Sequence, residues 1–303
     1  MNPWTPLALA TFGWACSVVL SRAVLVEGIN TWTLIPLRMS FALISLLIYM
    51  AISRRYWTAH RRAWARGAVL GIVAMALPMI FMTLGLEDLP VSLGSFLIAL
   101  IPIATIGAAH FLVEGERFKV KALPGLLIAL IGTAVLVGVG GVTIAGVGDL
   151  WRGVAFVMIG VILAGMGGAL TRRYALELSG DKLVLPQFTV STVVVVVVLP
   201  LISDFDVSTV EGVDWLMIAA VGVLGSTLAF TAFLVAADVN SAARLALTGY
   251  SVPVLAVAMA LVFLGESLTV SIIVGAILIF VGVVMTERAE REHVPEPGAV
   301  TAG

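Results

Sequence analysis

The sequence predicts an all-α membrane protein with ten transmembrane helices, arranged as two inverted five-helix repeats, and with both termini in the cytoplasm. Three observations support this prediction: the composition, a series of long uncharged runs, and an internal repeat. Of the 303 residues, 61% are hydrophobic and 12% are charged, whereas soluble domains are about 45–50% apolar and about 25% charged. This composition excludes an ordinary soluble domain and a disordered chain.

The charge balance and the cysteine count exclude further classes. The 17 Lys and Arg residues against 18 Asp and Glu give a net charge of −1. We therefore expect no nucleic-acid partner, because there is no basic surplus to neutralise phosphates. A single Cys excludes a disulfide framework and a Cys-based zinc site. We expect no metal and no other cofactor.

The uncharged runs predict the membrane spans, because a transmembrane helix needs roughly 20 mostly apolar residues. Nine such runs contain no Asp, Glu, Lys or Arg, and a tenth, 28–53, contains one interior charge, Arg38. The first repeat is expected over 1–141, the second over 149–287, and a cytoplasmic tail over 288–303. The expected spans are 4–22, 31–53, 67–86, 90–113 and 122–140 in the first repeat, and 151–171, 183–203, 214–237, 242–265 and 267–286 in the second.

Two segments could be interpreted differently. Residues 1–21 lack the basic n-region and the A-x-A-like site of a removable signal peptide, so they are expected to form the first helix. The run from Val193 to Val198 would indicate a strand in a soluble protein. Within an uncharged span, a helix is the structure that satisfies the backbone in lipid.

Basic side chains concentrate in alternate loops, which predicts the orientation. The loops after spans 2, 4 and 6 and the tail carry Arg54, Arg55, Arg61, Arg62 and Arg66, then Arg117, Lys119 and Lys121, then Arg172, Arg173 and Lys182, then Arg288 and Arg291. The opposite loops carry Glu27, Glu87, Asp88, Asp149, Asp204, Asp206, Glu211 and Asp214. Arg22 and Arg152, both at helix ends, are the exceptions. Lys and Arg collect on the cytoplasmic side, so both termini are predicted to be cytoplasmic. The expected location is the inner (plasma) membrane of a bacterium.

The two halves match at one offset, with one residue of slippage. Leu20-Ser21-Arg22 matches Leu170-Thr171-Arg172, Pro102 matches Pro253, and Gly115-Glu116 matches Gly265-Glu266. In both halves Gly follows that Glu at the same two spacings, giving Gly125 and Gly132, then Gly275 and Gly282.

An odd number of spans in each half turns the second half upside down, and the charges agree with this inversion. The loop 54–66 carries five Arg, whereas its counterpart 204–214 carries four carboxylates and no base. Inverted repeats characterise transporters that bind substrate near the midplane, between the two halves.

Several segments resemble a known family. GERFKVKALPGLLIALIG, GESLTVSIIVGAILIFVG and GYSVPVLAVAMALVFLGE, with Pro36 and Arg38, resemble the EamA-type branch of the drug/metabolite transporter (DMT) superfamily over residues 4–287. Trp14 with Arg22, and Tyr250 three residues before Pro253, are similar to the bacterial YddG-type exporters of amino acids. The resemblance implies ten helices in two halves and a secondary transporter that exports small metabolites.

A set of polar, aromatic and Met residues within the spans is predicted to line the substrate cavity. Aromatic and Met side chains form an adaptable apolar wall, and Ser and Thr supply hydrogen bonds. The alternative for each residue is ordinary helix packing, in which Ser and Thr also bond across helices. The predicted set is Trp14, Met79, Met82, Thr83, Ser95, Ala99, Thr227, Phe230, Thr231, Thr248, Tyr250 and Ser251.

A second set is predicted to have structural or gating roles: Arg38, Pro78, Pro102, Pro253, Glu116 and Glu266. A charge within a span is expensive. Arg38 is therefore a counter-charge for a substrate carboxylate, a gate residue, part of a structural ion pair, or a donor to helix-end carbonyls. Glu116 and Glu266 are expected to cap the helices that follow them, with gating or proton coupling as the alternative. A proline frees a carbonyl, which is tolerable in protein or beside a cavity. Gly94, Gly165, Gly167 and Gly168 are expected to ease helix movement.

The predicted function is export of amino acids with aromatic or apolar preference, by a monomer in the lipid bilayer. Export of lipophilic drugs is an alternative. A nucleotide-sugar or sugar-phosphate transporter should show several buried basic residues for phosphate, but only Arg38 is clearly interior. An intramembrane enzyme is not expected, because the sequence contains no HExxH, no paired intramembrane Asp and no His near a Ser nucleophile motif.

Overall fold

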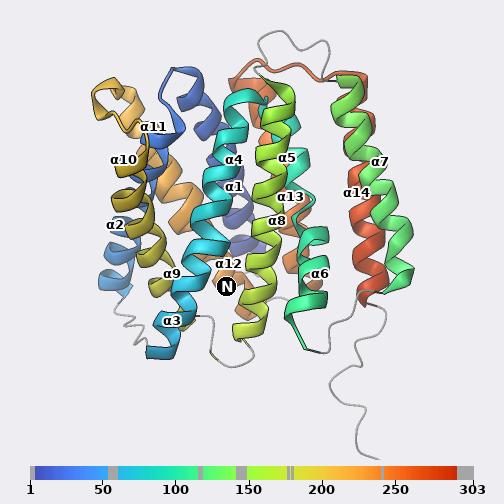
Figure 1. Cartoon of the computed structure of the whole chain (residues 1–303), viewed down its shortest axis with the longest axis horizontal. Helices are drawn as coiled ribbons and strands as arrows, with labels where there is room; N and C mark the ends of the chain where they lie inside the picture. Colours follow the sequence, from blue (N-terminus) through green and yellow to red (C-terminus); the bar gives the residue numbers. More distant parts are fainter. Residues whose placement is uncertain are drawn as a thin grey trace, which may run out of the picture.

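The computed structural model describes residues 4–53, 61–114, 119–140, 149–175, 178, 181–239 and 242–291. The residues in these ranges form helices and short connections, with no strand among them (Figure 1). In the first half of the chain, the elements are α1 (Trp4–Val26), α2 (Thr31–Ser53), α3 (Arg61–Leu70), η1 (Gly71–Ala76), α4 (Leu77–Asp88), α5 (Val91–Ile98), α6 (Ile101–Leu112), η2 (Val120–Ala122) and α7 (Leu123–Gly140). The second half contains α8 (Leu150–Ala175), α9 (Asp181–Val193), η3 (Val194–Val198), α10 (Leu199–Ile202), η4 (Val207–Thr209), α11 (Val213–Gly222), η5 (Val223–Leu228), α12 (Ala229–Val239), α13 (Ala242–Phe263) and α14 (Val270–Arg291).

Most of these helices join into long apolar rods. Within the described ranges, 7 rods are long and apolar enough to cross a membrane. They are Trp4–Val26, Thr31–Ser53, Arg61–Asp88, Val91–Leu112, Leu150–Thr171, Lys182–Leu201 and Val213–Phe233. The shorter apolar helices are Val120–Val135, Ser251–Phe263 and Val270–Thr286.

Several helix boundaries differ from the expected spans, and the largest differences in where a helix begins are in the third rod and the last helix. The third rod begins at Arg61 and not at 67, because the helix continues through the charged residues that precede the uncharged run. The last helix covers Val270–Arg291 and not 267–286. It begins late because Gly265, at φ +64°, ends the preceding helix in the left-handed conformation that glycine favours.

Three π-helical segments interrupt the rods. η1 lies between α3 and α4, η3 between α9 and α10, and η5 between α11 and α12. η1 begins at Gly71, and η5 begins directly after Gly222. These two glycines match between the halves of the sequence, at the repeat offset with its one residue of slippage. A π-helical turn leaves the regular hydrogen-bond ladder and is frequently found at functional sites.

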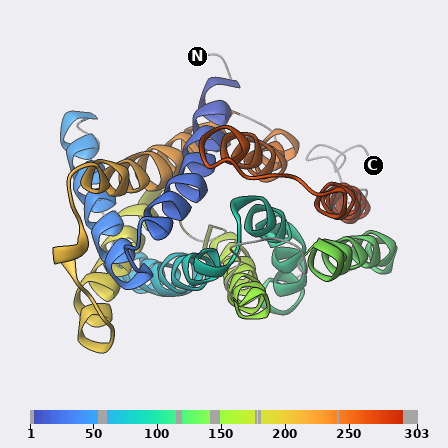
Figure 2. The ribbon, with the colours of Figure 1, turned by 90° about the horizontal axis from the view of Figure 1, so that it is seen from above.

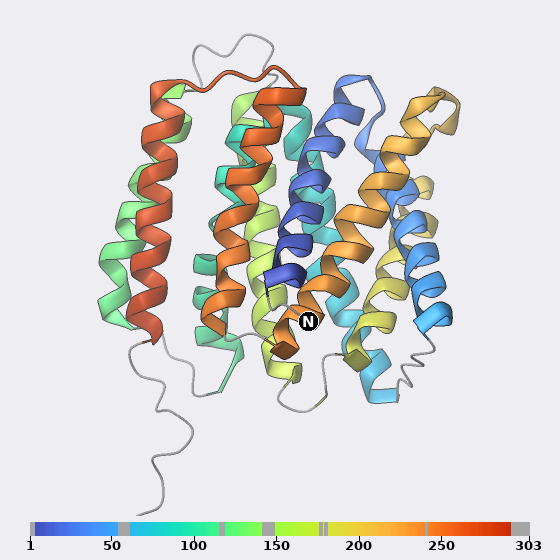
Figure 3. The same ribbon diagram turned by 180° about the vertical axis from the view of Figure 1, so that it is seen from behind.

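The helices α7 and α14 form a tight pair at one edge of the bundle (Figures 2 and 3). A Cβ added to Gly125 would lie 2.5 Å from the backbone nitrogen of Thr286, and one added to Gly132 would lie 2.7 Å from that of Ile279. Glycine therefore lets the two backbones approach closely, as small residues do between helices in lipid.

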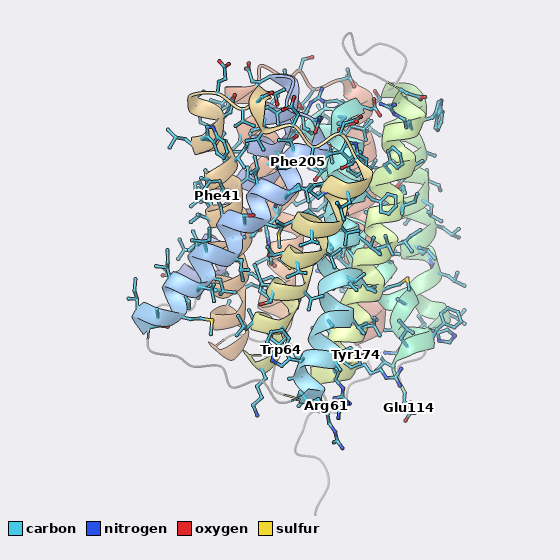
Figure 4. The ribbon with its side chains drawn as sticks, turned by 60° about the vertical axis from the view of Figure 1, so that its left-hand side comes forward. Phe41, Arg61, Trp64, Glu114, Tyr174 and Phe205 are labelled. Atoms are coloured by element: carbon cyan, nitrogen blue, oxygen red, sulfur yellow. The ribbon has the colours of Figure 1, made fainter. Side chains whose placement is uncertain are left out.

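The two ends of the bundle differ in charge. In Figure 4, Arg61, Trp64, Glu114 and Tyr174 lie at one end, and Phe205 lies at the opposite end. At the first end the guanidinium of Arg66 also lies 5.2 Å from the ring centre of Tyr174. The carboxylates of the 204–214 loop belong to the opposite end, beside Phe205.

Candidate substrate cavity

A cavity of about 370 Å³ lies among the helices that contain the two π-helical segments η1 and η5. Its lining comes from α1, α2, η1, α4, α5, α6, α8, α9, η5, α12 and α13. This volume falls within the ~300–1,000 Å³ that is usual for small-molecule sites. The lining residues Trp14, Ala164 and Val252 lie in the central parts of their long helices, which places the cavity at middle depth.

The cavity wall is mainly apolar and includes aromatic and Met side chains. Apart from the small aliphatic residues, its apolar lining consists of Trp14, Met75, Pro78, Met79, Met82, Leu86, Ile98, Ile101 and Phe230. The Trp14 ring centre lies 5.2 Å from that of Phe233, and the Phe230 ring contacts Phe188 edge-on at 5.4 Å. These ring pairs hold the two aromatic walls in place.

The polar lining consists of Ser17, Ser21, Arg38, Thr83, Gln187 and Ser226. Trp14, Ser17, Val18 and Ser21 all line the cavity, and they recur at helical spacing along one face of α1. Gly225 lets η5 approach this face, since a Cβ there would overlap the side chain of Ser17.

Arg38 is the cation of this polar group and is 8% exposed. Its guanidinium donates hydrogen bonds to the hydroxyl oxygens of Ser17 at 2.9 Å, Ser21 at 3.4 Å and Ser226 at 3.4 Å. The Nε atom of Arg38 is buried and has no hydrogen-bond partner within the described ranges. Arg38 is therefore held by neutral hydroxyls from α1 and η5, and among the described residues no carboxylate pairs with it.

A network of charged groups joins the helices beyond the cavity, at the end of the bundle where α4 stops. Arg22 donates from NH1 to the carbonyl oxygens of Leu86 at 2.6 Å and Glu87 at 2.8 Å. Leu86 also lines the cavity, so this contact lies directly at the cavity boundary. Asp88, 3% exposed, accepts hydrogen bonds from Arg152 Nε at 2.7 Å and NH2 at 2.8 Å.

Two glutamates at this end accept hydrogen bonds from the first residues of helices. Glu266 accepts from the backbone nitrogens of Val91 at 2.6 Å and Ser92 at 3.0 Å, at the start of α5. The expectation that Glu266 caps the helix following it is therefore wrong. It caps a helix of the other half, because the 264–269 connection crosses over that free N-terminus. Glu87 likewise accepts from Thr31 at the start of α2.

Part of the predicted residue set lines this cavity. Trp14, Met79, Met82, Thr83 and Phe230 do so, together with Arg38 and Pro78. The remaining residues of the set that the structure describes lie elsewhere: Ser95, Ala99, Pro102, Thr227, Thr231, Thr248, Ser251 and Pro253. The Tyr250 side chain and Glu116 lie outside the described residues.

The residues that lie elsewhere have identifiable surroundings. Thr227 donates to the carbonyl oxygen of Ala42 at 2.7 Å and accepts from Ser45 at 2.8 Å, so it joins η5 to α2. Thr231 donates to the carbonyl of Thr227 within its own helix. Ser251 lines a separate groove against α1 and α14. Helix rotation decides these positions, because a residue of suitable chemistry can face either the cavity or a neighbouring helix.

The prediction from sequence omitted Ser17, Ser21, Gln187 and Ser226. The serines of α1 carried a usable signal, because they share the helical stripe of Trp14. Ser226 lies in a π-helical segment, where the regular helical spacing does not predict the direction of a side chain.

The sequence model of the EamA-like transporter family matches residues 6–138 and 151–288. The chain belongs to the EamA-like transporter family. It is also 22% identical over 258 residues to the uncharacterized transporter YvbV of Bacillus subtilis (strain 168), across 81% of this chain and 79% of that protein. A protein crystal structure with 18% sequence identity superposes with a TM-score of 0.63, covering 94% of this chain and 99% of that one.

Family membership makes this EamA-like protein a multi-pass membrane transporter of small molecules. The family and the Bacillus relative point to a transporter and not to an enzyme. The superposition supports the fold of the chain. The kind of substrate has to be inferred from the residues that line the cavity.

Proposed function

We propose that this EamA-like protein exports amino acids with aromatic or apolar side chains, by alternating access around the cavity between its two halves. The observation that carries the proposal is the cavity lining, in which an apolar wall with Trp14, Phe230 and several Met residues surrounds one buried cation, Arg38. Such a wall accepts an apolar side chain, and a cation accepts a carboxylate.

The proposed topology has ten spans, formed by two inverted repeats over 1–141 and 149–287, with both termini in the cytoplasm of a bacterial inner membrane and one chain as the transport unit. Three observations support it. The family model matches the chain twice. The π-helical segments η1 and η5 begin at Gly71 and directly after Gly222, which match between the two halves. The basic end of the bundle contains Arg61 and Arg66, whereas acidic loops occupy the other end.

Flux in proteoliposomes tests the proposed substrate. Purified protein would be given labelled Phe, Trp and Leu, a sugar phosphate and a cationic drug, with and without a proton gradient. We expect saturable amino-acid flux that falls strongly in Trp14→Ala and Phe230→Ala. Phe263→Ala is the matched control, because Phe263 is 71% exposed on α13. Flux of only the sugar phosphate or the drug would contradict the proposal.

Cysteine labelling tests the topology. The chain has one Cys, Cys16, which is buried. In a Cys16→Ala background, a membrane-impermeant reagent added to intact cells should label Ser208→Cys and should not label Arg62→Cys. The reverse pattern would invert the proposed orientation.

A further inference from the structure

We infer that Arg38 is the carboxylate-binding group of the cavity, and that the substrate class is defined by a carboxylate joined to an apolar side chain, without a requirement for an amino group. This inference rests on the proposed transport function and defines its substrate class by the carboxylate and the apolar side chain. It predicts that aromatic carboxylates without an amine bind the same site, and that the corresponding amines do not.

The first argument is the state of Arg38. The side chain is more than nine-tenths buried, yet its partners in the described parts of the chain are three neutral hydroxyls, and its Nε atom has no hydrogen-bond partner there. A buried charge is costly unless an opposite charge compensates it. The guanidinium presents N–H donors in a planar fork that matches a carboxylate, so a ligand anion supplies the missing charge.

The second argument is what surrounds Arg38 in the cavity. None of the described lining residues is acidic. The nearest acidic cluster lies beyond Leu86, where Asp88 binds Arg152 and Glu87 binds Thr31. The cavity therefore offers a full positive charge to a carboxylate, whereas an ammonium group meets hydroxyl and amide oxygens and aromatic rings but no carboxylate among the described lining residues.

The third argument is the order of residues along α1. Ser17 and Ser21 lie beside the Arg38 guanidinium, and Trp14 lies one turn from Ser17 on the same face. One helical turn is about 5.4 Å, which is comparable to the distance between a carboxylate and a ring separated by two or three carbons. A ligand that places its carboxylate on Arg38 can therefore place its ring among Trp14, Phe230 and the Met residues.

The test uses matched ligands on the unmodified protein, followed by matched variants. Binding to purified protein in detergent would be measured by calorimetry for phenylalanine, 3-phenylpropanoate and 2-phenylethylamine. We expect the two carboxylates to bind with similar affinity and the amine to bind roughly 10- to 100-fold more weakly, because only the carboxylates form charge-assisted hydrogen bonds with Arg38. Arg38→Gln should weaken both carboxylates to the level of the amine, and Arg38→Lys should restore part of the loss. Arg61→Gln, at an exposed arginine, is the control.

The comparison of the three ligands on the unmodified protein tests the carboxylate preference even if Arg38→Gln does not fold. Equal binding of the amine and the carboxylates would overturn the inference. Displacement of 3-phenylpropanoate by equal concentrations of chloride or phosphate would also overturn it, since the site would then bind any anion. Amino-acid flux that persists in Arg38→Gln would remove the inference and leave the proposed export intact. Arg38-dependent binding of 3-phenylpropanoate without any amino-acid flux would support the inference and contradict the proposed amino-acid export.

Discussion

The arginine in the cavity and the arginines at the charged end beyond it have different kinds of partner. At the charged end, Arg152 faces Asp88 with two hydrogen bonds of 2.7 and 2.8 Å, and Arg22 donates to two backbone carbonyls. In the cavity, Arg38 is more deeply buried than either of them, and its guanidinium donates to three hydroxyls and to no carboxylate of the described residues. A carboxylate of the protein neutralises the charge of Arg152, whereas the described partners of Arg38 are uncharged.

This difference separates groups that stabilise the fold from groups available to a ligand. A carboxylate that accepts two guanidinium hydrogen bonds stabilises one arrangement of the helices that carry it, here α4 and α8. A buried cation without a counter-charge does not stabilise the empty protein. Variants at the charged end should therefore change mainly the unfolding free energy, and variants at Arg38 should change mainly the ligand affinity.

The largest effect is expected at Gly167 of α8, which packs closely against Ala74 of the cavity wall. In Gly167→Leu the new side chain would collide with Ala74, because a Cβ at Gly167 already overlaps the Ala74 backbone. Overpacking of this kind costs about 3 kcal/mol, and it should also slow transport if α8 and η1 move against each other. Thermal unfolding and flux measure the two effects. Gly107→Leu is the control, since nothing lies within 4 Å of a Cβ there, and equal behaviour of both variants would contradict the prediction.

Asp88→Ala should come next. It leaves the Arg152 guanidinium and the backbone nitrogen of Asp149 without their acceptor, so we expect a loss of about 1–3 kcal/mol in unfolding free energy. Unfolding in detergent measures this loss, with the exposed Asp204→Ala as control. Ligand affinity measured in the same variant should change little, because Asp88 does not line the cavity. Unchanged stability would show that this end is not held by the ion pair.

Arg38→Met should show the opposite pattern. Removing a buried charge that has no counter-charge should leave the unfolding free energy unchanged or raise it by about 1 kcal/mol, while carboxylate binding is lost. The same unfolding and calorimetry experiments measure both quantities. A loss of stability as large as that of Asp88→Ala would make Arg38 a structural residue, and the contrast between the two regions would disappear.

The smallest effects on stability and affinity are expected from two variants that distinguish cavity-lining residues from residues that pack helices together. Thr227→Val removes the hydrogen bonds to Ala42 and Ser45, so it should cost about 1 kcal/mol of stability and leave ligand affinity unchanged. Ser17→Ala removes a hydroxyl beside Arg38 and should change affinity more than stability. If Thr227→Val weakened binding instead, the cavity would extend further toward α2 than its present lining.

Single helices were predictable to different extents from the sequence. The second span was expected at 31–53 and is α2 over Thr31–Ser53, because a long apolar run between polar ends contains all the information needed. The start of α14 was misplaced, because the backbone conformation at Gly265 and the following extended connection interrupt an uncharged run without changing its composition.

The site could be predicted in part for a similar reason. Trp14, Met79 and Phe230 could be predicted as lining residues from their residue type and approximate depth in the membrane. Ser226 was not, because η5 is π-helical and turns its side chains away from the regular helical spacing. The bond of Glu266 to Val91 joins residues 175 positions apart, and no local pattern indicates such a pairing.

Composition and charge alone are sufficient for the helical membrane class, the approximate spans and the presence of one interior cation, since these follow from what each segment can bury in lipid. Family membership follows from the sequence as a whole. The partners of that cation follow from neither. Only the packing of α1 and η5 against α2 shows that Arg38 contacts three hydroxyls and no carboxylate of the residues that the structure describes. A contact between distant segments depends on helix rotation and register, which local sequence does not specify.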